Sequence, residues 1–120
     1  ARALAKVYGV LANGGSRDGV HILNPETIEK ARSVEAEGKD LVLANIQSKF
    51  GLGFMLGTEH ISMGPGESSF GHGGAGGSLA FADPDNKISL GFTMNQMHPG
   101  ITAWKTANDI ASLVYKLKGL

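Results

Sequence analysis

Three segments of this chain alternate with period two, and one face of each is built mostly from small residues. Bulky apolar side chains alternate largely with glycine, alanine and serine over residues 50–56, 77–83 and 88–95. Such alternation is the pattern of a β-strand. Because the second face is small and mostly uncharged, we expect another layer to pack closely on it, so that both faces of the sheet are covered.

The residues around these strands predict their connections and the helices. Asp83-Pro84-Asp85-Asn86 has proline at the second position of a turn, which predicts that strands 77–83 and 88–95 form an antiparallel hairpin. Asn24-Pro25-Glu26 has the residues of a helix start. Together with apolar residues at helical spacing, these signals predict helices over residues 1–13, 25–33 and 102–117. Residues 34–40 are polar and are interpreted as a loop.

These elements place the chain in the α/β class, of the α+β type, with an antiparallel sheet flanked by helices. We expect the helices at both ends of the chain to cover one face of the sheet together. The apolar stripe predicted for the last helix consists of Ala103, Ala107, Ile110, Val114 and Leu117. The first helical pattern begins without a capping residue, so we expect the chain to be a piece of a longer protein.

Charge and composition exclude several kinds of partner. Lys+Arg and Asp+Glu are equal at 11 each, and no basic run appears, so we expect no binding to nucleic acid or to an anionic membrane. No apolar run approaches the roughly 18–20 residues of a membrane-spanning helix. The absence of cysteine excludes disulfides and thiol catalysis. The histidines show no metal-ligand spacing, so we expect neither a metal nor another cofactor.

A glycine-rich segment containing His72 directly precedes strand 77–83. Residues 71–76 match G-x-G-x-x-G. A dinucleotide-binding loop, however, lies between a strand and a helix and has an acidic partner about 20 residues later, which is lacking here. The His-Gly-Gly oxyanion loop of α/β-hydrolases requires a nucleophile elbow, and Ser78, the nearest match, begins a strand instead. From the residues alone, a close-packed loop with an ordinary histidine also stays open.

The segment FGHGGAGGSLAFADPDNKISLGFTMNQM resembles the C-terminal third of the serine β-lactamase and penicillin-binding protein superfamily, especially its esterase and D-alanyl-D-alanine carboxypeptidase-like branch. The Lys-Thr-Gly or His-Thr-Gly strand motif of that superfamily reads here as His72-Gly73-Gly74. ARALAKVYGVLANGG, LNPETIEKA and FGLGFMLG are similar to the neighbouring segments of the family, so the resemblance covers nearly the whole chain. It implies the C-terminal part of a β-lactamase/transpeptidase-like fold.

The resemblance also implies a serine hydrolase that works through a covalent acyl-serine on a small ester, amide or peptide. The backbone N–H of Ala75 would be one of two oxyanion-hole donors. His72 would stand where a lysine or histidine helps to hold the nucleophile's network or the substrate carboxylate. Gly73 and Gly74 complete the motif. Because Gly73 replaces the usual threonine, a hydroxyl that would bind a carboxylate is lost, which favours neutral esters or amides.

The other two motifs of the superfamily are absent from this chain. No serine is followed by lysine three residues later, and neither Tyr8 nor Tyr115 begins Tyr-x-Asn or Tyr-x-Ser. We therefore expect the C-terminal portion of a longer hydrolase, inactive alone, which docks with the missing N-terminal part or associates with itself. The alternative is a non-catalytic penicillin-binding-like module used for binding or assembly.

Overall fold

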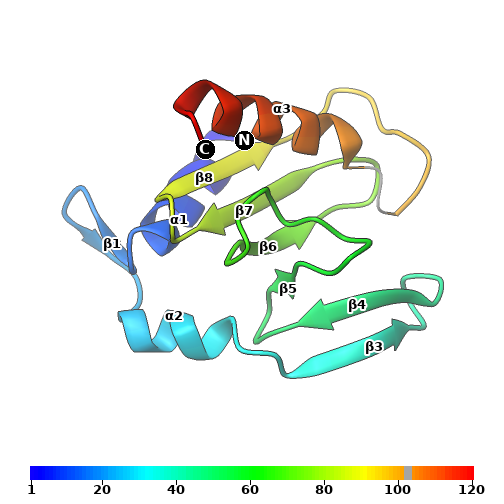
Figure 1. The fold of residues 1–120 in the computed structure, drawn as a ribbon, viewed down its shortest axis with the longest axis horizontal. Helices are drawn as coiled ribbons and strands as arrows, with labels where there is room; N and C mark the ends of the chain where they lie inside the picture. The colour runs from blue at the N-terminus through cyan, green and yellow to red at the C-terminus, as the bar shows by residue number, and fades with distance from the viewer. Residues whose placement is uncertain (102–103) are drawn as a thin grey trace.

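The computed structural model describes residues 1–101 and 104–120, and in these residues three helices accompany two antiparallel sheets (Figure 1). The helices are α1 (Arg2–Ala12), α2 (Pro25–Ala31) and α3 (Lys105–Lys118). The small sheet pairs β1 (Ser16–Arg17) with β2 (Val20–His21). The six-stranded sheet has the order β3-β4-β5-β6-β7-β8, with strands β3 (Ala36–Asp40), β4 (Ile46–Phe50), β5 (Met55–Leu56), β6 (Phe70–Gly73), β7 (Leu79–Asp83) and β8 (Ile88–Phe92).

The hairpin predicted from the Asp-Pro-Asp-Asn turn is confirmed as β7 and β8. The two strands pair in antiparallel register from Leu79 opposite Phe92 to Asp83 opposite Ile88. One carboxylate oxygen of Asp83 accepts hydrogen bonds from the backbone N–H groups of Asp85 (3.0 Å) and Asn86 (3.2 Å). The side chain of Asp83 thus fixes the turn, as aspartate does in an Asx-turn.

The small face of the sheet is covered closely, as the alternation predicts. Ser89 donates a side-chain hydrogen bond of 3.0 Å to the carbonyl oxygen of Ala5 in α1. A Cβ placed on Gly91 would lie 2.6 Å from the carbonyl oxygen of Ala1, so only glycine allows this approach. Leu11, Ala12 and Ile28 of α1 and α2 pack on this face with Leu56, Phe70 and Ala82 of the sheet.

The prediction that both terminal helices share one face is wrong, because α1 and α3 lie on opposite faces. In Figure 1, α3 runs in front of the sheet and α1 lies behind it. The second core joins Ala107, Ala111 and Tyr115 of α3 to the bulky face, with Met55, Ile61, Met63, Leu79, Phe81 and Trp104. Successive residues of a strand point to opposite faces, so Phe81 faces α3 whereas Ala82 faces α1.

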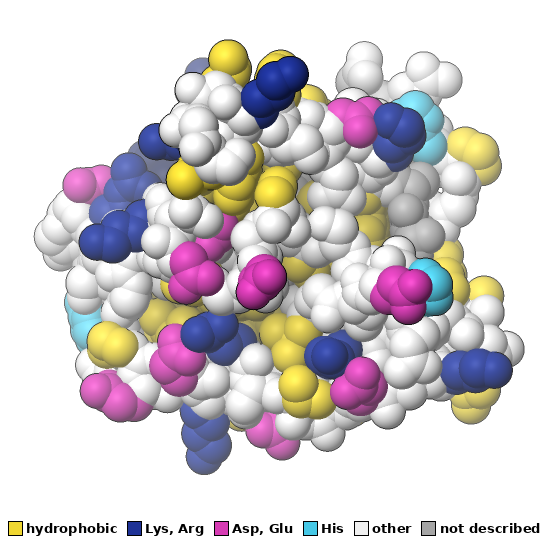
Figure 2. Space-filling view, in the orientation of Figure 1, with side chains coloured by type: hydrophobic (Ala, Val, Ile, Leu, Met, Phe, Trp, Pro, Cys, Tyr) yellow, Lys and Arg dark blue, Asp and Glu magenta, His cyan; other side chains and the backbone are white. Residues whose placement is uncertain are grey.

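The apolar stripe predicted for the last helix is also corrected. The buried residues of α3 are Ala107, Ala111 and Tyr115, whereas Ile110, Leu113, Val114 and Leu117 are exposed. Ala103 and Thr102 lie outside the described residues. The small alanines let α3 pack close to the bulky side chains of the sheet. If isoleucine and valine faced the sheet instead, the helix would have to lie further from it. Figure 2 shows hydrophobic atoms of this helix at the surface, among interspersed acidic and basic side chains.

The predicted strand 50–56 is mostly a turn between two strands: it includes only the last residue of β4 and the two residues of β5, and the rest of β4 was not predicted. β4 ends at Phe50, and the same residue pairs with Met55 at the start of β5. Between them, Gly51 donates its N–H to the carbonyl of Phe54 (2.9 Å), and Leu52 donates its N–H to the carbonyl of Ala31 (2.8 Å). The alternation of apolar residues and glycine continues through this turn, so the sequence pattern does not mark it.

Other element bounds shift, and two strands lie where loops were expected. The segment 34–40, interpreted as a loop, contains β3, an edge strand whose Glu37 forms an ion pair of 3.5 Å with Lys49 of β4. Its backbone pairing requires no apolar side chain, which explains the missing signal. β6 lies within the glycine-rich segment. The predicted strands 77–83 and 88–95 are observed at Leu79–Asp83 and Ile88–Phe92, and the predicted helices 1–13, 25–33 and 102–117 at the bounds of α1, α2 and α3.

Tyr115 fastens α3 to the hairpin through a buried hydrogen bond from its hydroxyl to the second carboxylate oxygen of Asp83. Burial, with the hydrogen bond and charge of Asp83, raises the pKa of Tyr115 above its ordinary value of 10.0. A raised pKa in the folded state means that the stabilisation is complete below about pH 10 and declines as the pH rises beyond it. We therefore expect the free energy of unfolding, measured by urea titration, to fall as the pH is raised above about 10.

Tyr115→Phe should lessen this alkaline decline. Tyr8→Phe is the comparison and should lessen the decline less, because burial alone raises the pKa of Tyr8 and no carboxylate contributes. An alkaline slope in Tyr115→Phe equal to that of the unaltered protein would contradict the prediction.

Candidate active site

The predicted motif lies at the end of an inner strand of the six-stranded sheet. His72 and Gly73 are the last residues of β6, and they pair with Ala80 and Leu79 of β7. The next residues form the loop that returns the chain to β7, where the N–H of Gly74 donates to the carbonyl of Ser78 (2.8 Å). Ser78 directly precedes β7 and no helix follows it, so it does not form the nucleophile elbow of an α/β-hydrolase.

The ring of His72 is exposed and is oriented by its own strand. Its Nδ1 lies 2.7 Å from the carbonyl oxygen of Gly73. Because a carbonyl oxygen only accepts, this bond requires the proton on Nδ1. In the neutral ring Nε2 is then left as a hydrogen-bond acceptor. The ring centroid is 6.2 Å from that of Phe50. This arrangement lets His72 accept a hydrogen bond from a hydroxyl placed at the end of β6.

Ala75 presents a backbone donor that the described part of the chain does not use. Within residues 1–101 and 104–120, no hydrogen bond from the Ala75 N–H is formed, and the residue is exposed. The neighbouring Gly76 N–H, in contrast, donates to the carbonyl of Gly100 (3.2 Å). A free backbone N–H in a glycine-rich turn can stabilise a negatively charged oxygen.

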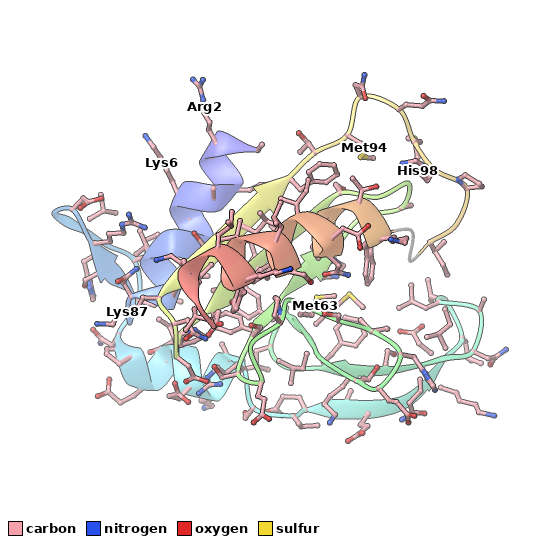
Figure 3. All side chains as sticks on the ribbon, turned by 45° about the horizontal axis from the view of Figure 1, so that its top comes forward. Arg2, Lys6, Met63, Lys87, Met94 and His98 are labelled. Atoms are coloured by element: carbon pink, nitrogen blue, oxygen red, sulfur yellow. The ribbon has the colours of Figure 1, made fainter. Side chains whose placement is uncertain are left out.

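A cavity of about 340 Å³ brings three of the four predicted site residues together. His72, Gly73 and Ala75 line it, whereas Gly74 is not among its lining residues. The remaining lining residues are Asp40, Val42, Leu43, Phe50, Met55, Ile101 and Trp104. A larger cavity of about 550 Å³ lies beside α1 and the small sheet, and it contains none of the predicted residues. Its lysine, Lys6, projects away from the sheet in Figure 3.

Sequence reasoning missed the walls of this cavity that come from the β3–β4 turn and from the loop after β8. That loop carries His98 (Figure 3), whose N–H donates to the carbonyl of Gly76 (2.9 Å). This bond and the one from Gly76 to Gly100 hold the loop against the glycine-rich turn. They bring Ile101 and Trp104 to the cavity. The available signal was that Trp104 is the single tryptophan of the chain and follows the His98-Pro99-Gly100 break.

Trp104 explains why glycine occupies the middle position of the motif. A Cβ built on Gly73 would overlap the indole ring of Trp104. The indole N–H donates a hydrogen bond of 2.9 Å to the carbonyl of Gly74, and the Trp104 side chain is buried. The indole therefore occupies the space beside β6 where a larger residue at position 73 would extend.

Within the residues that the structure describes, no three metal-ligating side chains are grouped together. No helix among them is long and apolar enough to cross a membrane.

An antiparallel sheet with helices on both faces, and a glycine-flanked strand motif beside a cavity, are features of the β-lactamase and penicillin-binding protein superfamily. The chain belongs to the beta-lactamase family, because the family model described as Beta-lactamase matches residues 1–112. Both the resemblance and the fold class inferred from the sequence are thereby confirmed.

Three relatives illustrate this membership. The chain is 33% identical over 97 residues to the esterase/beta-lactamase LipL of Mycobacterium tuberculosis, covering 81% of this chain and 22% of that protein. A crystal structure of a family VIII carboxylesterase is 34% identical, with a TM-score of 0.85 over 94% of this chain and 30% of that one. A penicillin-binding protein homolog from Caulobacter crescentus is 35% identical, with a TM-score of 0.87 over 95% of this chain and 30% of that one. The chain thus spans less than a third of the length of these relatives.

Proposed function

We propose that this chain supplies the third-motif part of the active site of a β-lactamase-related serine hydrolase, and that the full-length protein hydrolyses small neutral esters. The observation that carries the proposal is that His72 and the N–H of Ala75, to which no described residue offers an acceptor, line the same cavity. The relatives named an esterase/beta-lactamase and a carboxylesterase support the reaction class.

In the proposed reaction, a serine outside this chain attacks the ester carbonyl, the acyl C–O bond breaks, and the alcohol leaves with the proton that the serine gives up. Water then hydrolyses the acyl-serine to the carboxylic acid and the free serine. The Ala75 N–H donates a hydrogen bond to the carbonyl oxygen as it gains negative charge. Such a donor stabilises the transition state more than the ground state. His72 accepts, at Nε2, a hydrogen bond from a hydroxyl of the nucleophile's network. No serine of this chain is followed by lysine three residues later, so the chain alone lacks the Ser-x-x-Lys nucleophile that the proposal requires.

A non-catalytic binding or assembly module is the second candidate, and two exposed features favour it. In the described part of the chain β8 has a neighbouring strand on one side only. The outer side of α3 exposes Leu113 (56%) and Leu117 (78%). An open strand edge and exposed apolar side chains are features that recruit partners.

The proposed function is tested by comparing hydrolysis of p-nitrophenyl butyrate by the full-length protein and by the 120-residue chain. We expect turnover by the full-length protein and none above background by the chain, because only the former can supply a nucleophile. His72→Ala in the full-length protein should reduce kcat without lowering the melting temperature, because the ring is exposed and its hydrogen bond is to the adjacent residue.

A kcat of His72→Ala equal to that of the unaltered protein would contradict the proposed role of His72. A full-length protein without any turnover, together with a 120-residue chain that self-associates in sedimentation, would favour the assembly module instead.

A further inference from the structure

Away from His72 and Ala75, the cavity beside the motif has mostly apolar walls. Its walls include the rings of Phe50 and Trp104 and the side chains of Met55, Leu43 and Ile101. Met55 and Trp104 are buried, and both belong to the core beneath α3. Apolar walls of this kind bind alkyl or aryl groups by removing their surface from water.

Asp40 contributes an acidic side chain to the lining of the cavity. Asp40 turns one carboxylate oxygen to the N–H groups of Val42 (2.8 Å) and Leu43 (3.1 Å), and this fixes the β3–β4 turn. Among the described residues that line the cavity there is no lysine or arginine. A carboxylate bound here would therefore lack a cationic partner and would lie near the charge of Asp40, which disfavours it.

Trp104 controls the shape of the cavity at the motif. Its indole packs on Gly73, and its N–H fixes the carbonyl of Gly74. Because the ring fills the space beside the second motif position, it leaves no room for a side-chain hydroxyl there. The same ring presents an apolar wall next to His72 and Ala75.

We propose that this cavity is the subsite for the uncharged apolar group of the ester substrate, and that Trp104 packed on Gly73 determines this specificity. The inference rests on the proposed function, because the cavity becomes a substrate subsite only if the motif lies in the active site. Each methylene group that enters the cavity should raise kcat/KM about fourfold, until the cavity is filled.

The first test uses matched p-nitrophenyl esters and the full-length protein. The acyl chain of the hexanoate ester ends in a methyl group, whereas that of the adipate monoester ends in a carboxylate. We expect kcat/KM for hexanoate to exceed that for the adipate ester by about 10² or more, mainly through KM. Hexyl acetate and the acetate ester of 6-hydroxyhexanoate repeat the comparison on the alcohol side, and they show which side of the ester enters the cavity. Equal kcat/KM values within both pairs would overturn the inference.

Val42 allows a test by gain of function, because it lines the cavity and is 88% exposed at the β3–β4 turn. Val42→Arg should raise the ratio of kcat/KM for whichever carboxylate-bearing ester places its chain here to kcat/KM for its neutral partner severalfold. Val42→Gln, of similar length without the charge, is the matched control and should leave this ratio near that of the unaltered protein. If Val42→Gln raised the relative kcat/KM for the carboxylate-bearing ester as much as Val42→Arg, the selectivity could not be due to the lack of a cation in the cavity.

The role of Trp104 in binding the apolar group is tested by a measurement that does not depend on turnover. Titration with 2-octanone, which cannot be hydrolysed, should shift the indole N–H signal of Trp104 in a ¹H–¹⁵N spectrum, assigned by its loss in Trp104→Phe. The carboxylate analogue 7-oxooctanoate should leave the signal unshifted at the same concentration. Trp104→Ala should lower kcat/KM for the favoured long-chain ester about 10-fold or more, with a melting curve to verify folding.

Together these measurements distinguish failure of the proposed subsite from failure of the proposed function. Ester hydrolysis without chain-length dependence and without an indole shift would overturn the subsite and leave the proposed function standing. An indole shift with 2-octanone in a protein that hydrolyses no ester would instead reject the proposed function and leave an apolar ligand site.

Discussion

Ala75→Pro in the full-length protein is expected to lower kcat for a neutral ester by about 10²–10³, the cost of losing one oxyanion-hole donor. Proline removes the backbone N–H that we place beside the developing negative charge. The substitution is feasible because, within the described residues, this N–H is not used by the fold, and Ala75 is not among the residues with a positive φ. Initial rates with p-nitrophenyl butyrate measure the effect.

Ala75→Gly is the matched control, because it removes the methyl group and keeps the N–H, so it should retain most of the activity. Circular dichroism and a melting curve must show that Ala75→Pro is folded. Full activity in a folded Ala75→Pro protein would reject the oxyanion role, and the glycine-rich segment would then be a close-packed loop.

Asp83→Ala should destabilise the full-length protein by at least about 1–3 kcal/mol, the cost of leaving one buried hydrogen-bond donor without its acceptor. Asp83 is fully buried at the end of β7. Its carboxylate accepts hydrogen bonds from the hairpin turn, from the Asn86 side chain (2.8 Å) and from the hydroxyl of Tyr115. Alanine would leave these donors without their partner and would detach α3 from the hairpin. Urea denaturation measures the loss.

Two controls locate this effect. Asp85→Ala changes an exposed carboxylate two residues away and should alter stability by no more than about 0.5 kcal/mol. Asp83→Asn keeps one acceptor oxygen and should fall between Asp85→Ala and Asp83→Ala. An Asp83→Ala protein as stable as Asp85→Ala would show that this carboxylate does not hold the hairpin to the helix.

The motif His72-Gly73-Gly74 and its family were readable from the sequence because they depend on residues adjacent in the chain. The residues that form the walls of the cavity could not be predicted from the sequence in the same way. Asp40, Met55 and Trp104 meet at one cavity although long stretches of chain separate them. No periodic pattern links such positions, because a pattern records only the local geometry of one strand or helix.

The hairpin of β7 and β8, the three helices and a closely covered small face followed from the sequence alone. Each depends on turn chemistry, capping residues or side-chain size over a short span. The tertiary structure decided which face each helix covers, which side of α3 is buried, and that Gly73 makes room for Trp104. These outcomes depend on how the volumes of side chains from distant segments fit together, and packing at that density is a property of the assembled molecule.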